Sequence, residues 1–280
     1  MRKEMSPHAI LVQVIMPELP EVEVVRERTE RQCSGRVVSS VVVRDEGVLE
    51  DCSAKALASL CIDRRITGVQ RHGKQMFIEL DRKGFVTVHL GMTGDLEFNE
   101  RRGEPAKHDR VLFNFKDGSR LTYRDMRKFG AIGCTEGVGH FVALKGLGPD
   151  ALEVGRQEFA SRIRKHDRAI KTVLLDQHVI AGIGNLYADE ALFQSRIHPL
   201  MSAKGLSDEE VDALFRSVRR VLLASIRVAT DFDRLPRSYL LRARESGAQC
   251  PRKNGRLSSI RVNGRTSFYC PSCQSIPAVE

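Results

Sequence analysis

The chain has 280 residues, enough for about two domains with buried cores. Its formal net charge of +9 favours a polyanionic partner such as nucleic acid. No apolar run approaches the ~20 residues that span a bilayer, and the short run Ala9–Ile15 lacks a following small-residue cleavage site. We therefore expect neither a membrane protein nor a signal peptide. Seven mostly scattered cysteines suit a reducing cytoplasm rather than a disulfide framework.

The first half of the chain predicts a β-rich domain with one helix near its start. A helical apolar stripe begins after Pro20 and ends near Cys33. Alternating or β-branched runs predict mostly antiparallel strands, over Val37–Val43, Thr67–Arg71, Gln75–Leu80, Phe85–Leu90, Arg110–Phe115 and Arg120–Arg124. An Asp-Gly turn joins the last two strands as a hairpin. We expect two packed sheets over residues 16–145.

The second half predicts helices and then a short hairpin, which makes the fold class α+β. The turn-rich Gly146–Asp150 is the predicted domain boundary. Helical patterns follow in the next domain, residues 150–246, at Glu158–Lys165, Ala169–Asp176, Ala188–Gln194 and Asp208–Thr230. Ser207 and Glu210 form a capping box before the longest helix. In residues 247–280, Asn263-Gly264 predicts a hairpin between Arg256–Val262 and Thr266–Tyr269.

The stretch Met16–Glu23 carries the chemistry around which the chain is organised. If translation starts at Met16 and that methionine is removed, Pro17 becomes a terminal secondary amine. An α-amino group titrates near pH ~8, so a useful fraction is unprotonated at neutral pH. Such an amine can attack an aldehyde-like carbon and form an iminium. Glu18 is placed to move the protons that attack and elimination require. The alternative is a plain loop entering a helix.

Fifteen residues precede Met16 in this sequence. As part of an amide, the nitrogen of Pro17 would have no nucleophilic lone pair. We therefore expect the biological start to be Met16 and residues 1–15 to be an extension that is absent from the native protein.

Several loop residues have the chemistry of DNA contacts. Lys74 follows a glycine at the head of a strand and could hold a phosphate or polarise a leaving group. Met92 lies in a two-glycine turn, and apolar wedges of this kind enter distorted duplexes. Arg127 could read a base edge and Phe129 could stack into a gap. His108 could donate to a phosphate. For each of them an ordinary exposed or core residue is the alternative.

Two further residues are predicted to meet the DNA backbone. The segment Gly182–Glu190 contains Gly-x-Gly-Asn before an amphipathic helix, typical of a helix–two-turn–helix. Its backbone N–H groups could bind phosphate, with the side chain of Asn185 as a further donor. Arg265 lies at the turn of the C-terminal hairpin. A plain connection and a solvated arginine are the alternatives.

The C-terminal hairpin also carries an incomplete zinc pattern. Cys250 precedes its first strand, and Cys270 and Cys273 follow the second, as in structural zinc sites with two Cys-x-x-Cys knuckles. Lys253 occupies the place of the fourth ligand, and an ammonium cannot coordinate zinc. Two alternatives stay open. Three thiolates could hold zinc together with a water or a carboxylate, or the hairpin could form without metal.

Taken together, these residues resemble the formamidopyrimidine-DNA glycosylase and endonuclease VIII family of base-excision repair enzymes. The resemblance runs from Met16 to about Gln274 and rests on three motifs: Pro17–Glu23, His89–Gly94, and Gly182–Glu190 with its following His198-Pro199. The first two favour the formamidopyrimidine branch. The resemblance implies an N-terminal β-sandwich with flanking helices, a helix–two-turn–helix domain and a zinc-finger-like hairpin, with duplex DNA between the domains and no organic cofactor.

The resemblance also implies roles for individual residues. Pro17 would be the nucleophile, Glu18 the general acid and base, and Glu21 a supporting carboxylate, while Lys74 would hold phosphate and aid catalysis. The void left by the extruded base would be filled by Met92, Arg127 and Phe129, and Arg127 would face the orphan cytosine. Contacts to the DNA backbone would come from His108, Asn185 and Arg265.

The expected activity is a bifunctional glycosylase and lyase for oxidised purines, namely 8-oxoguanine and formamidopyrimidines. We expect a monomer that acts in the cytoplasm at the bacterial nucleoid. Residues Asp231–Arg237 look abbreviated where the family has a loop that closes over the lesion. The alternatives are therefore action on oxidised pyrimidines or abasic sites, and a damaged-DNA-binding protein without catalysis.

Overall fold

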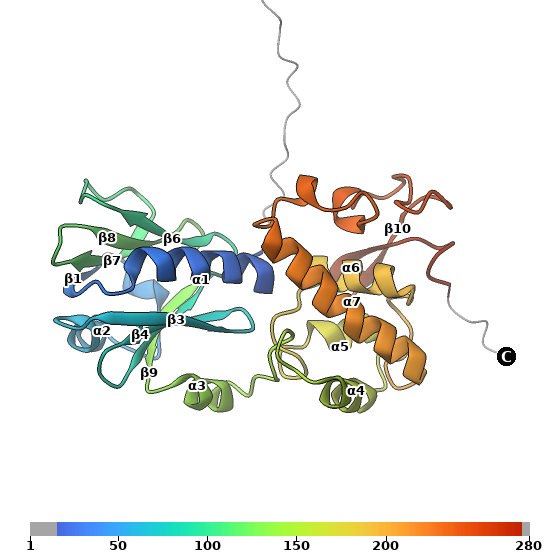
Figure 1. Cartoon of the computed structure of the whole chain (residues 1–280), viewed down its shortest axis with the longest axis horizontal. Helices are drawn as coiled ribbons and strands as arrows, with labels where there is room; N and C mark the ends of the chain where they lie inside the picture. The colour runs from blue at the N-terminus through green and yellow to red at the C-terminus, as the bar shows by residue number, and fades with distance from the viewer. Residues whose placement is uncertain (1–15, 276–280) are drawn as a thin grey trace, which may run out of the picture.

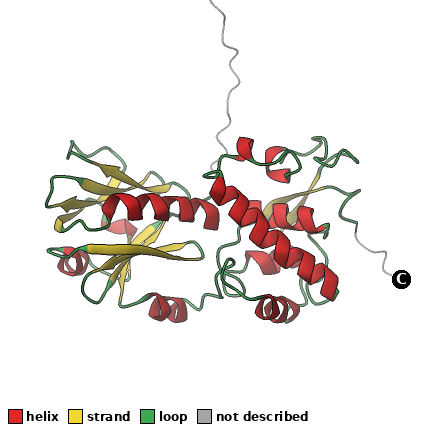
Figure 2. Ribbon diagram, viewed as in Figure 1, coloured by secondary structure: helices red, strands yellow, loops and turns green. Residues whose placement is uncertain are grey.

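The computed structural model describes residues 16–275 and confirms the α+β class. Figure 1 shows a β-rich half and a helical half side by side, and Figure 2 shows how strands and helices are divided between them. Helix α1 (Leu19–Cys33) packs against strands of the first half and against α7 (Asp208–Arg227) of the second. The expectation for residues 1–15 lies outside the described residues.

The β-rich half is built from two sheets. One has the strand order β1-β7-β8-β6 and the other β2-β9-β5-β4-β3. The bounds are β1 Val38–Val43, β2 Leu49–Glu50, β3 Ile66–His72, β4 Gln75–Leu80, β5 Phe85–His89, β6 Gly94–Asn99, β7 Asp109–Phe115, β8 Arg120–Asp125 and β9 Ala131–Thr135. Their apolar faces share one core, which includes Met76, Val88 and Tyr123. The alternating residues thus fold as predicted, because one face of each strand is buried.

Three strands and two helices of this half were not predicted from the sequence. They are β2, β6, β9, α2 (Ala54–Cys61) and α3 (Val138–Leu144). The helices are eight and seven residues long, too short for a clear periodic stripe. Strand β6 begins at a glycine and alternates Asp and Glu with apolar residues, as suits a strand at the edge of its sheet. The pair β2–β9 is parallel, while the other pairs of these two sheets are antiparallel, in line with the predicted mostly antiparallel pairing.

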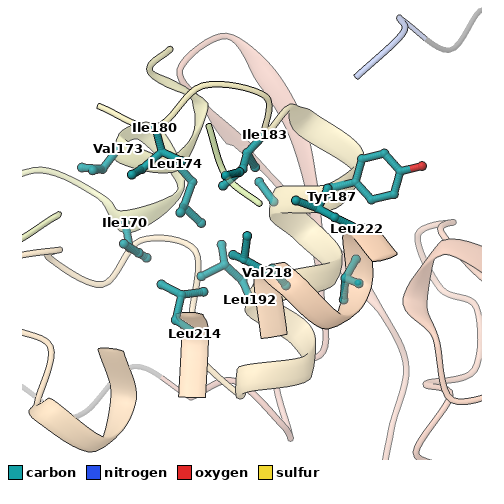
Figure 3. Packing of buried hydrophobic residues seen from close by; sticks show 14 of the residues in the cluster. Ile170, Val173, Leu174, Ile180, Ile183, Tyr187, Leu192, Leu214, Val218 and Leu222 are labelled. Carbon is teal, nitrogen blue, oxygen red and sulfur yellow. The ribbon is translucent and has the colours of Figure 1, made fainter. Parts of the chain in front are cut away.

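The helical half has its own core (Figure 3). It contains α4 (Arg156–Arg164), α5 (Ile170–Leu175), α6 (Asn185–Ser195) and α7. The capping box at Ser207 and Glu210 is confirmed. Helix α6 begins three residues before the predicted start, while α7 ends at Arg227 and is followed by left-handed backbone at Ala229 and Thr230. Among residues 16–275 no helix is both long and apolar enough to cross a membrane.

The C-terminal hairpin is held to α6 by a buried aspartate. Strands β10 (Ser258–Val262) and β11 (Arg265–Tyr269) pair antiparallel as predicted. The carboxylate of Asp189 accepts hydrogen bonds from Ser267 Oγ at 2.7 Å and from Phe268 N at 3.1 Å. It also accepts from Lys171 Nζ at 2.5 Å and from Arg244 Nη2 at 2.8 Å. Four residues donate to this one buried carboxylate, which offsets its desolvation and fixes the hairpin.

An arginine clamp joins the two halves at the turn between β3 and β4. Arg71 donates to Asp150, which is fully buried, and to Glu23 Oε2 at 2.7 Å. Asp150 also accepts from the amide of Gly73 at 2.6 Å. A Cβ on Gly73 would lie 2.8 Å from the Cβ of Ala181, so the turn sits directly on the loop before α6. The clamp therefore sets the distance between Lys74 and that loop.

Replacing Arg71 with alanine should destabilise the fold strongly. The change leaves a buried carboxylate without its charged partner, which costs roughly 3–5 kcal/mol. Urea unfolding measures the loss. The control is Lys83→Ala, which breaks an exposed ion pair with Glu136 and should stay within experimental error. Equal stability of the Arg71→Ala and Lys83→Ala proteins would contradict the clamp.

Candidate active site

The carboxylate of Glu18 lies buried against the first turn of α6. Its Oε1 accepts from Leu186 N at 2.8 Å and its Oε2 from Tyr187 N at 3.3 Å. These amides have no partner within the helix, and the helix dipole favours a negative charge beside them. Pro17, half-buried, lies one residue before this anchor. The start of the β-rich half is therefore fixed on the helical half.

Two glycines make room for this contact. A Cβ on Gly184 would lie 2.2 Å from Glu18 Cδ, and one on Gly182 would lie 2.5 Å from Leu19 Cδ1. Gly182 also has φ +110, and its carbonyl accepts from Leu19 N at 3.1 Å. The prediction that these helix N–H groups bind phosphate is wrong for Leu186 and Tyr187, because the carboxylate of Glu18 occupies them.

Glu21 closes the same network from the first turn of α1. Its Oε1 accepts from the hydroxyl of Tyr187 at 2.6 Å, and its Oε2 accepts from Glu18 N at 3.0 Å. In Figure 3 the ring of Tyr187 packs at the edge of the apolar cluster and its hydroxyl points away from it. Burial, and to a lesser extent the nearby charge of Glu18, raises the pKa of Glu21 to about 7.

Glu18 and Lys74 face the same cavity. This Glu18 cavity has a volume of about 510 Å³ and is also lined by Met92, Asn185 and Arg265. Burial raises the pKa of Glu18, against a smaller opposite effect of Lys74 and the backbone amides. Burial likewise lowers the pKa of Lys74. Both shifts are toward neutral pH, the direction in which a carboxyl group and an ammonium group become better suited to exchange protons.

The predicted void-filling residues lie on two loops beside this cavity. Met92 lines it directly. Phe129 is 58% exposed, and the guanidinium of Arg127 lies 4.8 Å from the centre of its ring. Phe129 also lines a neighbouring cavity of about 380 Å³ that reaches Lys74. Phe129 is thus an exposed apolar side chain next to the site, while Met92 is half-buried.

Of the three residues predicted to contact the DNA backbone, two line the Glu18 cavity and one does not. Arg265 is exposed and lines the Glu18 cavity. Asn185 lines it too, but its Nδ2 donates to the carbonyl of Thr266 at 3.1 Å. His108 is half-buried and does not line that cavity, and its Nδ1 lies 3.4 Å from Arg110 Nη2.

The three C-terminal cysteines converge as the sequence predicts. The sulfur atoms of Cys250, Cys270 and Cys273 all lie within 4.8 Å of one another, so the cluster could hold a metal ion. The Sγ atoms of Cys250 and Cys273 are 3.7 Å apart, close to the ~3.8 Å that a tetrahedral site with 2.3 Å Zn–S bonds requires. Lys253 is exposed, and the side-chain oxygen of Asn254 lies 3.1 Å from Cys273 Sγ.

Sequence reasoning missed the residues that hold the site together. Tyr187, Asp189 and Asp125 are all buried and accept or donate within the network. A signal was present for Asp189, which interrupts an otherwise apolar helix face with a charge. None was present for Tyr187, because its partner Glu21 is 166 positions away in the chain.

Comparison with known families agrees with this geometry. The model of the formamidopyrimidine-DNA glycosylase N-terminal domain matches residues 16–132, and that of the H2TH domain of the same glycosylase matches residues 146–234. The chain belongs to the formamidopyrimidine-DNA glycosylase family. The resemblance seen in the sequence is thus confirmed.

Individual family members match over nearly their whole length. The formamidopyrimidine-DNA glycosylase of Pelotomaculum thermopropionicum is 35% identical over 93% of this chain and 100% of that protein. That of Enterococcus faecalis is 33% identical over 93% of this chain and 98% of the relative. Two solved structures agree in fold, each covering 93% of this chain and 100% of its own. The Lactococcus lactis Fpg with abasic DNA has a TM-score of 0.84 at 27% identity, and MutM with carbocyclic 8-oxo-G DNA has 0.84 at 28%.

Replacing Glu21 with glutamine should change how stability depends on pH. With a folded pKa of about 7 and an ordinary value of 4.5, Glu21 binds its proton more tightly when folded, so it stabilises the fold below pH 4.5 and this contribution is lost as pH rises to 7. Between pH 4.5 and 7 the free energy of unfolding should therefore fall less steeply with pH in Glu21→Gln. The two slopes should differ by about one bound proton, or ~1.4 kcal/mol per pH unit.

The matched control is Glu27→Gln, which removes one charge from the exposed face of the same helix. Its slope should follow that of the unmodified protein. A Glu21→Gln protein with an unchanged slope would show that Glu21 is not buried as a neutral acid.

Proposed function

We propose that this chain is a DNA glycosylase and abasic-site lyase of base-excision repair, with Pro17 as nucleophile. The observation that carries the proposal is the burial of Glu18 against α6, immediately after Pro17 and facing a cavity with Lys74 and Arg265. The family membership and the DNA complexes of the structural relatives support it. The acidic and basic groups of this cavity suit attack on a sugar carbon followed by proton transfer.

The chemistry begins with the free amine of Pro17. Its lone pair forms a bond to C1′ of the damaged nucleotide as the glycosidic bond breaks, and the proton that the amine nitrogen loses is taken up by the departing base. Glu18, whose pKa is raised by burial, donates its proton to the sugar ring oxygen, and the ring opens to an iminium. As a carboxylate, Glu18 then removes a proton from C2′, and the 3′-phosphate leaves by β-elimination. Once it has passed that proton to solvent, Glu18 can remove a proton from C4′, and the 5′-phosphate leaves by δ-elimination.

Duplex DNA is the proposed partner. Lys74 and Arg265 line the Glu18 cavity and are cations that can hold phosphates on either side of an extruded nucleotide. Met92, Arg127 and Phe129 would fill the space that this nucleotide leaves, with Arg127 facing the orphan cytosine. His108 and Asn185 would meet the backbone. In this proposal a monomer places DNA between residues 16–145 and residues 150–246, and acts on chromosomal DNA in the cytoplasm.

Oxidised purines are the proposed lesions. Support comes from the names of the relatives and from the solved complexes of MutM with 8-oxo-G DNA and of Lactococcus lactis Fpg with Fapy-dG DNA. The segment after α7 is compact: Phe232 packs edge-on against Tyr187, with 6.4 Å between the ring centres, and Leu235 is buried. Since this segment packs on the protein, the extruded base is read mainly by the walls of the Glu18 cavity.

Borohydride trapping tests the nucleophile. The full 280-residue chain and a chain started at Met16 with that methionine removed contain the same site, but only the second has a free Pro17 amine. Reduction in the presence of abasic duplex DNA should crosslink the second form and leave the first largely free. Replacing Pro17 with glycine in the second form should reduce crosslinking severalfold. Equal crosslinking by the full chain would overturn the mechanism.

Zinc is the metal proposed for the cysteine cluster. Cys250, Cys270 and Cys273 would supply three thiolates, and zinc would act as a structural link between the two ends of the hairpin. The fourth position is not filled by Lys253, and the oxygen of Asn254 is the nearest replacement in this structure. A site with three thiolates should release its metal more readily than one with four.

Replacing Lys253 with cysteine should tighten zinc binding. The new thiolate completes the quartet, and transfer of zinc to a chromogenic chelator should require at least about tenfold more chelator, equivalent to ~1.4 kcal/mol. Lys253→Ser is the control, since it removes the ammonium without adding a strong ligand. Equal zinc retention by Lys253→Cys and Lys253→Ser would contradict the proposed site.

A further inference from the structure

A buried carboxylate at the end of β8 connects the two loops beside the Glu18 cavity. Asp125 is fully buried. Its Oδ1 accepts from Thr93 Oγ1 at 2.5 Å and from Arg127 N at 3.1 Å, and its Oδ2 accepts from Gly130 N at 2.9 Å. One of these donors belongs to the Met92 loop and the other two to the loop of Arg127 and Phe129. The side chain thus bridges Thr93 and Arg127, which are 34 positions apart in the chain.

The backbones of the two loops also touch. A Cβ on Gly91 would lie 2.3 Å from Gly130 N, and a Cβ on Gly130 would lie 2.4 Å from the carbonyl oxygen of His89. Gly91 has φ +60, a conformation that suits glycine. With no side chains between them, the loops pack backbone to backbone, and moving them apart would break their hydrogen bonds to Asp125.

Thr93 completes the bridge through its hydroxyl. The hydroxyl donates to Asp125 and accepts from Arg127 N at 3.0 Å. It therefore takes part in two of the bonds that tie the Met92 loop to Arg127. Asp125 extends the connection through its backbone, since its amide donates to the carbonyl of His108 at 3.0 Å.

We propose that Asp125 and Thr93 are positioning residues that hold Met92, Arg127 and Phe129 as one preformed wedge for the duplex. This inference rests on the proposed function. A wedge that is ordered before binding avoids the entropic cost of fixing two loops on the DNA. Side chains that act together would enter the stack as a unit, so the space opposite the orphan base is filled whenever the lesion is extruded.

The test compares duplex and single-stranded DNA that carry the same abasic site. A single strand has neither an orphan base nor a stacked gap, so its reaction needs the amine but not the wedge. Thr93→Val keeps the shape of the side chain and removes the hydroxyl, while Thr93→Ser keeps the hydroxyl and is the matched control. Asp125→Asn is the second variant. Borohydride trapping and strand cleavage are measured in the form whose terminus is Pro17.

With Thr93→Val, kcat/KM on the duplex should fall about tenfold or more, because hydrogen bonds to a buried charge are lost. The preference for cytosine over adenine opposite the lesion should shrink at the same time. Trapping on the single strand should stay within about twofold of the unmodified protein. Thr93→Ser should behave like the unmodified protein on both substrates, and Asp125→Asn should resemble Thr93→Val.

Three results would overturn the inference. Thr93→Val could match the unmodified protein on both substrates, which would show that the bridge does not matter. It could lose both reactions equally, which would place its effect on the fold or on the chemistry. Failure of the unmodified protein to trap either substrate would overturn the proposed function itself, and the wedge with it.

Discussion

The structure depends on one buried carboxylate at the junction of its two halves. Glu18 is only 3% exposed and lies against the first turn of α6, where two N–H groups and the helix dipole replace part of its lost hydration. Removing water from a charge is costly, so the contact persists only because Gly184 lets the carboxyl group approach the helix closely. The same burial raises its pKa, which turns a structural contact into an acid beside Pro17.

Other polar contacts keep that junction in place. The ion pair of Arg71 with Asp150 holds the β3–β4 turn, with Lys74, against the loop before α6. Asp189 fastens the hairpin with Arg265 to the same helix. Helix α6 is thus the common support of residues that come from three separate parts of the chain. The hairpin is anchored by Asp189 whether or not the cysteines hold metal, which is consistent with a lysine at the fourth ligand position.

The sequence predicted the elements whose pattern is local. Alternating strands, the Ser207 capping box and the Asn-Gly hairpin turn need only neighbouring residues to be recognised, and all three are present. Short elements such as α2 were missed because eight residues carry little periodicity. The sequence singled out Gly182–Gly184 as part of a phosphate site, but in the structure the helix amides of Leu186 and Tyr187 bind Glu18. Their role depends on Glu18, which lies 166 positions earlier than Gly184 and can be placed beside it only by the fold.

The central claim is that Pro17 is the nucleophile, and Lys74 is the alternative. Its pKa is lowered by burial, as for Schiff-base lysines, and it lines the same cavity. Digestion of the reduced protein–DNA crosslink followed by tandem mass spectrometry would identify the modified nitrogen. The account predicts a sugar remnant on the amine of Pro17. A remnant on the side chain of Lys74 would contradict it.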